Sequence, residues 1–188
     1  FNTANLQSLE VGQKVNFLGR DLTVGKILDE SIKGKGGMIH NPVVLIEEGS
    51  YSTRAILVGS ADEGGSISSV ANIDFYIKSN SSNGRNTLNI GLALTNDEFQ
   101  RRGALSVLYK YIFDHHNVPP ITAKASSFAM TNQAVFTESI IEQIYPGYLK
   151  RNPIPSGLKE FDYYDSVDDA FKKCCSQKFS ELQNANAL

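Results

Sequence analysis

Four apolar runs of seven to eleven residues follow one another between residues 42 and 95. They are PVVLIEE (42–48), STRAILVGS (52–60), SVANIDFYIKS (69–79) and TLNIGLALT (87–95). Short polar links separate them, and the link SNSSNGRN at 79–86 consists mostly of Ser, Asn and Gly, which favour turns. Successive strands joined by short links predict an antiparallel meander.

The pattern changes after residue 95. Helical spacing predicts an amphipathic helix over 104–116, with Leu105, Leu108, Tyr109, Ile112 and Phe113 on its apolar side. ITAKASS (121–127) predicts a short strand, and two more helices are expected, over about 132–144 and after Ser166. This order predicts an α/β (α+β) fold, in which helices flank a mixed, largely antiparallel central sheet.

The length of 188 residues suits one domain over 1–188. Residues 1–40 mix strand-like and helix-like spacing, and the glycines of IKGKGGMIH (32–40) predict a flexible loop. That loop lacks the Lys-Ser/Thr ending of a phosphate-binding P-loop. The chain begins with Phe1 rather than Met, as a processed product or a piece of a longer protein would.

Composition excludes several classes of function. A formal net charge of −2 argues against a broad, charge-driven nucleic-acid binder. No apolar run approaches the roughly 18–20 residues that cross a bilayer, and the N-terminus lacks the pattern of a secretory signal. Cys174 and Cys175 are adjacent, which argues against a disulfide framework, and they lack matching histidines at ligand spacing, which argues against a zinc site. We therefore expect a cytoplasmic protein with reduced thiols, without a metal or a membrane partner.

A polar turn, Gln100-Arg101-Arg102-Gly103, joins the fourth strand to the 104–116 helix. A helix N-terminus has free backbone N–H groups and a partial positive charge, so it suits a phosphate. Glycine allows close approach of an anion, and two arginines add charge and fork-shaped donors. These features predict a phosphate or pyrophosphate site; the alternative is a solvated turn whose arginines face water.

The segment EFQRRGAL (98–105) resembles the pyrophosphate loop of the GNAT superfamily of N-acetyltransferases. Gln100 and Gly103 match its Gln/Arg-x-x-Gly-x-Gly/Ala pattern, and LNIGLAL lies where the fourth strand of the family would be. ITAKASSFAMTNQAVF resembles the fifth strand and the following helix, with Asn132 at the position of the family's Asn. The resemblance spans about 88–148, and Leu105 stands where the family has a second small residue.

The resemblance implies a GNAT-like domain that binds acetyl-CoA as co-substrate. The pyrophosphate would lie on the backbone amides of the turn, and the pantetheine would pair with the exposed backbone of the fourth strand, where it splays from the fifth. The implied contacts are Leu92, Ala93, Leu94, Gln100, Arg101, Arg102, Gly103, Ala104, Leu105, Ser106 and Asn132. Strand alternation puts Gly91 and Ala93 on one face and Ile90, Leu92 and Leu94 on the other.

The implied reaction is direct attack of an amine on the thioester carbonyl. The amine must lose a proton, and the departing thiolate gains one. Tyr145 is the candidate general acid and Ser139 the alternative, because the Tyr that many family members carry in the following helix is missing. Asp74, or Glu47 or Glu48, could act as a base through water. His115 and His116 close the 104–116 helix, where positive charge is favourable.

Three functions fit these observations. The first is transfer of an acetyl group from acetyl-CoA to a small-molecule or protein amine. The second is a catalytically inactive GNAT-like module that binds acyl-CoA or a protein. The third is an unrelated mixed α/β binding protein whose loop matches by accident. The sequence specifies neither the acceptor amine nor the oligomeric state.

Overall fold

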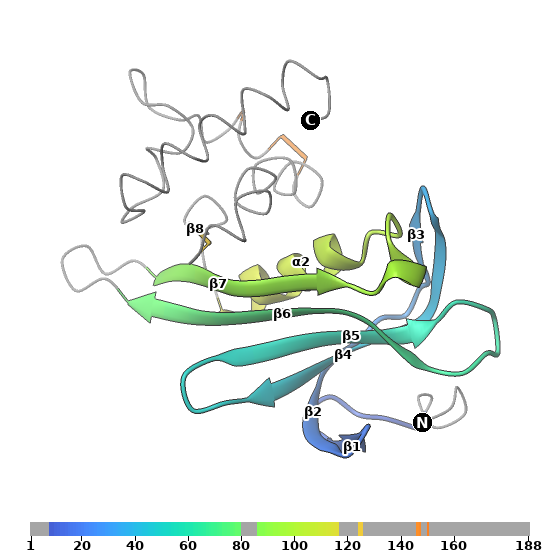
Figure 1. Ribbon diagram of the computed structural model, residues 1–188, viewed down its shortest axis with the longest axis horizontal. Coiled ribbons are helices and arrows are strands. Elements are labelled where there is room, and N and C mark those ends of the chain that lie inside the picture. The colour runs from blue at the N-terminus through green and yellow to red at the C-terminus, as the bar shows by residue number, and fades with distance from the viewer. Residues whose placement is uncertain (1–7, 80–85, 117–123, 126–145, 148–149, 151–188) are drawn as a thin grey trace. The chain divides into compact units, whose positions relative to one another are not determined.

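The computed structural model describes residues 8–79, 86–116, 124–125, 146–147 and 150. Within these ranges eight strands form one sheet: seven follow the order β1-β2-β4-β5-β6-β7-β8, and β3 pairs with β4 beside this path (Figure 1). The strands are β1 Lys14–Phe17, β2 Arg20–Ile27, β3 Ile32–Gly34, β4 Gly37–Glu48, β5 Thr53–Ser60, β6 Ser68–Ser79, β7 Asn86–Thr95 and β8 Lys124–Ala125. Helix α2 spans Ala104–His116, and the 3-10 helix η1 spans Asp97–Phe99.

The sheet is mostly antiparallel. β4 pairs antiparallel with β2, β3 and β5, and β5 pairs antiparallel with β6. β7 and β8 pair in parallel, with Asn89 opposite Lys124 and Ile90 opposite Ala125. The four strands predicted between residues 42 and 95 and the 104–116 helix are confirmed, as are the α+β class and the largely antiparallel sheet. Of the strand predicted over 121–127, the described residues 124–125 form β8. The helices predicted over about 132–144 and after Ser166 lie outside the described residues.

Residues 32–40 differ from the flexible loop that the sequence predicts. They form a tight hairpin, in which Ile32 lies opposite Ile39 and Gly34 opposite Gly37. Ile32 and Ile39 are buried, at 9% and 0% exposure, so the hairpin is anchored in the core at its base. The glycines therefore belong to the tip of an ordered hairpin.

The chain divides into two compact units, one made of residues up to 75 with 92–112, and the other of 76–91 with residues from 113 onward. In the first unit, strands β1, β2, β4 and β5 bury one apolar cluster together with Ile67. Alternate residues of β4 and β5 supply its centre, as the two-residue period of a strand requires. The cluster contains Phe17, Leu22, Val24, Val43, Leu45, Ile56, Val58 and Ile67.

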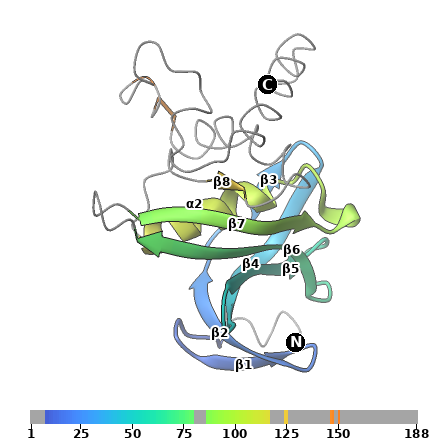
Figure 2. The same ribbon diagram turned by 60° about the vertical axis from the view of Figure 1, so that its left-hand side comes forward.

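Helix α2 lies along one side of the sheet (Figure 2). Its apolar side is buried, with Leu108 and Ile112 at 0% exposure. The Tyr111 hydroxyl lies so close to β2 that a Cβ added at Gly25 would be 2.6 Å from it. Burial, with a smaller contribution from the Glu48 carboxylate, raises the pKa of Tyr111 above its ordinary value.

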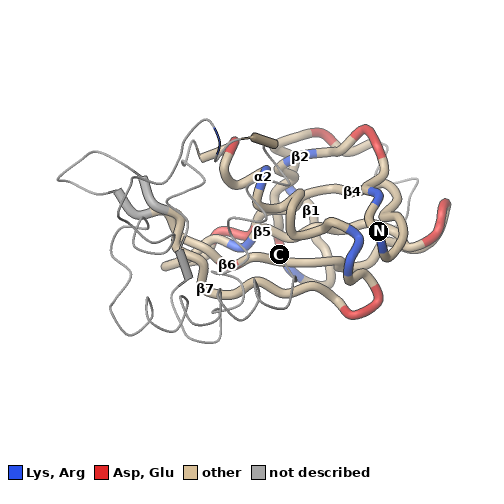
Figure 3. Tube along the Cα trace, turned by 90° about the horizontal axis from the view of Figure 1, so that it is seen from above, with Lys and Arg blue, Asp and Glu red and all other residues tan. Residues whose placement is uncertain are grey.

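Positive and negative residues alternate in short segments along the described part of the chain (Figure 3). No helix within the described ranges is long and apolar enough to cross a membrane.

Candidate functional site at the start of helix α2

The turn that precedes α2 is built by a cap and two unusual backbone conformations. The Asn96 side chain accepts a hydrogen bond from the Glu98 backbone N–H at 3.4 Å and so starts η1. Phe99 is buried at 1% exposure and fastens the end of η1 to the core. Arg101 has φ 62° and Gly103 has φ 83°. Glycine adopts the left-handed backbone conformation of residue 103 without the steric cost that a residue with a Cβ incurs.

The β3–β4 hairpin lies directly against this turn, as both views show (Figures 1 and 2). The Gly36 N–H donates to the Arg101 carbonyl oxygen at 2.8 Å. A Cβ added at Gly34 would be 2.5 Å from the Arg102 backbone, and one at Gly36 would be 2.4 Å from the Gln100 carbonyl oxygen. Close approach of two backbones thus explains these glycines.

Arg102 fastens the turn to the hairpin. Its Nη1 donates to the Met38 carbonyl oxygen at 2.7 Å, and its guanidinium carbon is 5.2 Å from the centroid of the Phe99 ring. Its Nε is buried, with no hydrogen-bond partner among the described residues. The sequence predicts Arg102 as a phosphate donor, whereas the structure gives its side chain protein contacts. Arg101 remains exposed, and so do Lys33 and Lys35 on the neighbouring hairpin.

The end of β7 is open on one face. Ile90 is fully buried, whereas Leu92 and Leu94, two and four residues further on, are 37% and 52% exposed. These residues share a face by strand alternation, so this face leaves the core as β7 approaches the turn. Ala93 is half-buried. Past the turn, Ala104 is buried, while Leu105 and Ser106 are half-buried in the first turn of α2.

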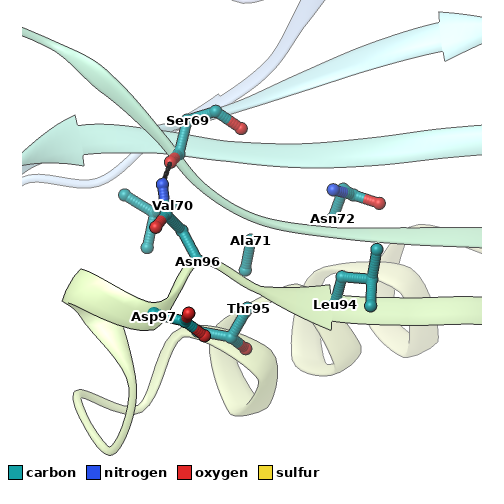
Figure 4. Close-up of a pocket in the computed structure, with 8 residues that line it drawn as sticks. All are labelled: Ser69, Val70, Ala71, Asn72, Leu94, Thr95, Asn96 and Asp97. Atoms are coloured by element: carbon teal, nitrogen blue, oxygen red, sulfur yellow. Dashed lines mark hydrogen bonds between the residues drawn. The ribbon is translucent and has the colours of Figure 1, made fainter.

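A cleft of about 390 Å³ lies between the start of β6 and the end of β7 (Figure 4). Asn96 closes one end, because its N–H donates to the Val70 carbonyl oxygen at 2.8 Å and its Nδ2 donates to the Ser69 carbonyl oxygen at 3.3 Å. The lining residues are Ser69, Val70, Ala71, Asn72, Leu94, Thr95, Asn96 and Asp97.

Leu94 is the one lining residue of this cleft that sequence reasoning connects with a ligand. The pantetheine was expected where β7 splays from β8, whereas the cleft lies on the side of β7 that faces β6. The sequence contains only a weak signal for this cleft, which is the amide side chain of Asn72 within the apolar run SVANIDFYIKS. Its position opposite the end of β7 depends on strand pairing, which spacing along one strand does not reveal.

The carboxylates considered as bases all have partners. Arg54 lies opposite Asp74 in the register of β5 and β6 and forms two bonds with it, Nε to Oδ1 at 2.5 Å and Nη2 to Oδ2 at 3.1 Å. The hydrogen bond to Asp74 raises the pKa of Arg54 above its ordinary value. Glu47 pairs with Arg20, and Glu48 accepts a hydrogen bond from the Thr53 hydroxyl at 3.1 Å.

These pairs form a line of alternating charge across four neighbouring strands. Arg20 on β2 forms an ion pair with Glu47 on β4. Glu47 lies opposite Arg54 on β5, and Arg54 forms an ion pair with Asp74 on β6. The Val70 carbonyl oxygen accepts a hydrogen bond from Asn96, which lies beside the turn. Asp74 is four residues further along β6 than Val70, which places the two residues about 13 Å apart in an extended strand. Asp74 therefore serves the sheet and lies away from the turn.

We expect Asp74→Asn to lower the free energy of unfolding by roughly 1 kcal/mol, because it removes one charge from a part-buried pair. Turnover of any transfer reaction should stay at the wild-type value. Urea unfolding measured beside a turnover assay checks both expectations. Stability equal to that of the wild type, together with lost turnover, would restore Asp74 as a base.

The other predicted site residues, Tyr145, Ser139 and Asn132, lie outside the described residues, as do Cys174 and Cys175. His115 and His116 close α2 as predicted, with their rings in an edge-to-face contact at 4.9 Å between centroids. The structure brings Leu92, Ala93 and Leu94 together with the turn in one compact unit. Within the described ranges, no three His, Cys, Asp or Glu side chains gather as metal ligands.

No protein-family model, curated protein or solved structure matches this chain.

Proposed function

We propose that the protein is an acyl-CoA-dependent N-acetyltransferase, which transfers an acetyl group directly from acetyl-CoA to an amine. The observation that carries this proposal is the exposed cation Arg101 in a glycine-bearing turn at the N-terminus of α2, directly after the open end of β7. A helix N-terminus with an adjacent guanidinium favours a diphosphate. The pairing of β7 with β8 adds support, because α2 lies between these two strands in the chain, as the resemblance implies for the fourth and fifth strands.

Acetyl-CoA would contact the turn, the neighbouring β3–β4 hairpin and the end of β7. The backbone amides of 101–106 and the Arg101 guanidinium would hold the diphosphate. Lys35 lies between Gly34 and Gly36 in the hairpin that contacts the turn, and its exposed side chain adds positive charge to this region. The exposed end of β7 at Leu92–Leu94 would take the pantetheine, and Leu105 would border it.

The acetyl transfer needs a base for the amine and an acid for the thiolate. Asp74, Glu47 and Glu48 are held by Arg54, Arg20 and Thr53, so we assign none of them as the base. Proton removal by solvent water and protonation of the thiolate by Tyr145, with Ser139 as the alternative, complete the proposal.

Calorimetric titration with acetyl-CoA tests the first half of this proposal. Release of free thiol in the presence of a panel of amines tests the second half. A chain that does not bind acetyl-CoA would overturn the function as a whole. Binding without thiol release would leave only the cofactor site.

We expect Arg101→Glu to weaken acetyl-CoA binding by about tenfold or more at low salt, because an anion replaces an exposed cation beside a diphosphate. The loss should shrink as salt screens the charges. Lys14→Glu on β1 is the matched control, since it makes the same charge change at an exposed position on the edge strand. Equal affinities in both variants would remove Arg101 from the site.

Arg102→Glu separates binding from folding at the same turn. It removes the hydrogen bond to the Met38 carbonyl and the contact with the Phe99 ring. We therefore expect it to lower the melting temperature as well as the affinity, whereas Arg101→Glu lowers the affinity alone.

A catalytically inactive acyl-CoA-binding or protein-interaction module is the second candidate. The engagement of Asp74, Glu47 and Glu48 in cross-strand pairs favours it, as does Leu105 at the position of a small residue. Binding of acetyl-CoA without thiol release for every amine in the panel would select this candidate.

A further inference from the structure

We propose that the cleft between β6 and β7 binds a small, elongated primary amine in its cationic form. This inference does not rest on the proposed acyl-CoA site: the two share Leu94, but the cleft lies on the side of β7 that faces β6, and binding to it is tested without nucleotide. It rests on the shape of the cleft, on the polar groups at its two ends and on the absence of cations from its lining.

The cleft has a polar side chain toward each of its two ends. Figure 4 places Asn72 and Leu94 toward one end, Asn96 and Asp97 toward the other, and Ala71 between them. From Ser69 to Asn72 the strand advances three residues, which corresponds to about 10 Å. A ligand that reaches both ends therefore has a short aliphatic chain between two polar groups.

The carboxylate of Asp97 supplies the charge. Its Oδ1 accepts from Gln100 Nε2 at 3.1 Å, and no described residue bonds its Oδ2. The side chain is exposed at the mouth of the cleft, and no Lys or Arg is among the eight lining residues. An ammonium group donates up to three hydrogen bonds and matches an unneutralised carboxylate, whereas an anion would be repelled.

The side-chain amide of Asn72 supplies the second contact. Within the described ranges it forms no side-chain hydrogen bond, and it is half-buried beside the exposed Leu94. An amide both donates and accepts, so it pairs with a hydroxyl or a second amine at the far end of the ligand. Leu94, which is 52% exposed beside Asn72, offers the aliphatic chain an apolar contact.

The probe is 5-aminopentan-1-ol, and pentane-1,5-diol is its neutral counterpart of equal length. Each is titrated into the full chain without acetyl-CoA, and binding is followed by ¹H–¹⁵N NMR. We expect the amino alcohol to shift the Asn72 side-chain amide and the Asp97 backbone amide, with saturation in the millimolar range or tighter. The diol should leave both signals in place.

Two variants at neighbouring acids separate a specific contact from general charge. Asp97→Asn keeps an oxygen acceptor for Gln100 and removes the charge, so we expect the affinity for the amino alcohol to fall about tenfold or more. Glu98→Gln changes the same charge one residue away, outside the cleft lining, and should bind as the wild type does. Asn72→Leu should weaken the amino alcohol and leave simple pentylamine unchanged.

Three outcomes would overturn the inference. One is equal shifts with the diol and the amino alcohol, and another is equal losses in Asp97→Asn and Glu98→Gln. The third is the absence of saturable shifts at Asn72 and Asp97. Acetyl-CoA binding, measured separately, is expected to be the same in the wild type and in Asp97→Asn, so failure here is distinguishable from failure of the cofactor site.

Discussion

Replacement of Gly34 by alanine should lower the free energy of unfolding by roughly 1–3 kcal/mol and separate the β3–β4 hairpin from the turn before α2. The added Cβ would lie 2.5 Å from two backbone atoms of Arg102 and 2.6 Å from the Arg101 carbonyl oxygen. Backbone atoms cannot rotate away as a flexible side chain can, so one of the two segments has to move. The movement would break the Gly36 N–H bond to Arg101.

Urea unfolding measures the loss of stability, and hydrogen exchange at the Gly36 amide reports on the contact itself. Gly64→Ala is the control, because a Cβ there meets nothing within 4 Å and only its φ of +73° is unfavourable. Gly64→Ala should lower the free energy of unfolding through backbone strain at residue 64, while the Gly36 amide stays protected from hydrogen exchange. Retained protection in Gly34→Ala would show that the hairpin and the turn are not in close contact.

Gly103→Val is expected to abolish acetyl-CoA binding and also to lower the melting temperature. At φ 83° a β-branched residue is strained by roughly 1–3 kcal/mol. A Cβ at this position would be 3.4 Å from an Ile32 methyl group, which is ordinary contact, so the strain comes from the backbone. The valine side chain would also cover the amides at the start of α2.

Gly103→Asn separates these two effects. Asparagine tolerates a left-handed backbone, so this variant should fold with a nearly unchanged melting temperature. Its side chain still occupies the space beside the amides, and acetyl-CoA binding should be weakened. Wild-type affinity in Gly103→Asn would mean that Gly103 serves only the turn. Calorimetry at a temperature where both variants are folded makes the comparison.

Local pattern was sufficient for most of the elements. The apolar runs ending at Glu48, Ser60, Ser79 and Thr95 became β4 to β7, and the spacing of Leu105, Leu108 and Ile112 gave α2 from residue 104 to 116. These elements follow from side-chain periodicity, which is read within a single segment. For residues 32–40 the sequence predicts a flexible loop, whereas the structure has an ordered hairpin. The reason is that glycine is common both in flexible loops and where two backbones touch.

The candidate site was only partly predictable. The turn at Arg101 and Gly103 could be found, because a strand, a glycine-bearing cationic link and a helix follow one another in the chain. The partner of Asp74 could not, because Arg54 is 20 residues away and meets it through the register of two strands. The same holds for the cleft, whose two walls come from the start of β6 and the end of β7.

The sequence by itself determined the α+β class, the order of β4 to β7 and α2, and the placing of a cationic turn before α2. Each depends on residues close together in the chain, where apolar period, turn formers and helix ends act locally. Only the tertiary structure decided that Arg102 donates to the Met38 carbonyl oxygen, and that Gly34 and Gly36 are needed for contact with residues 100–102. Those roles arise between segments more than sixty residues apart, where packing rather than local propensity selects the partner.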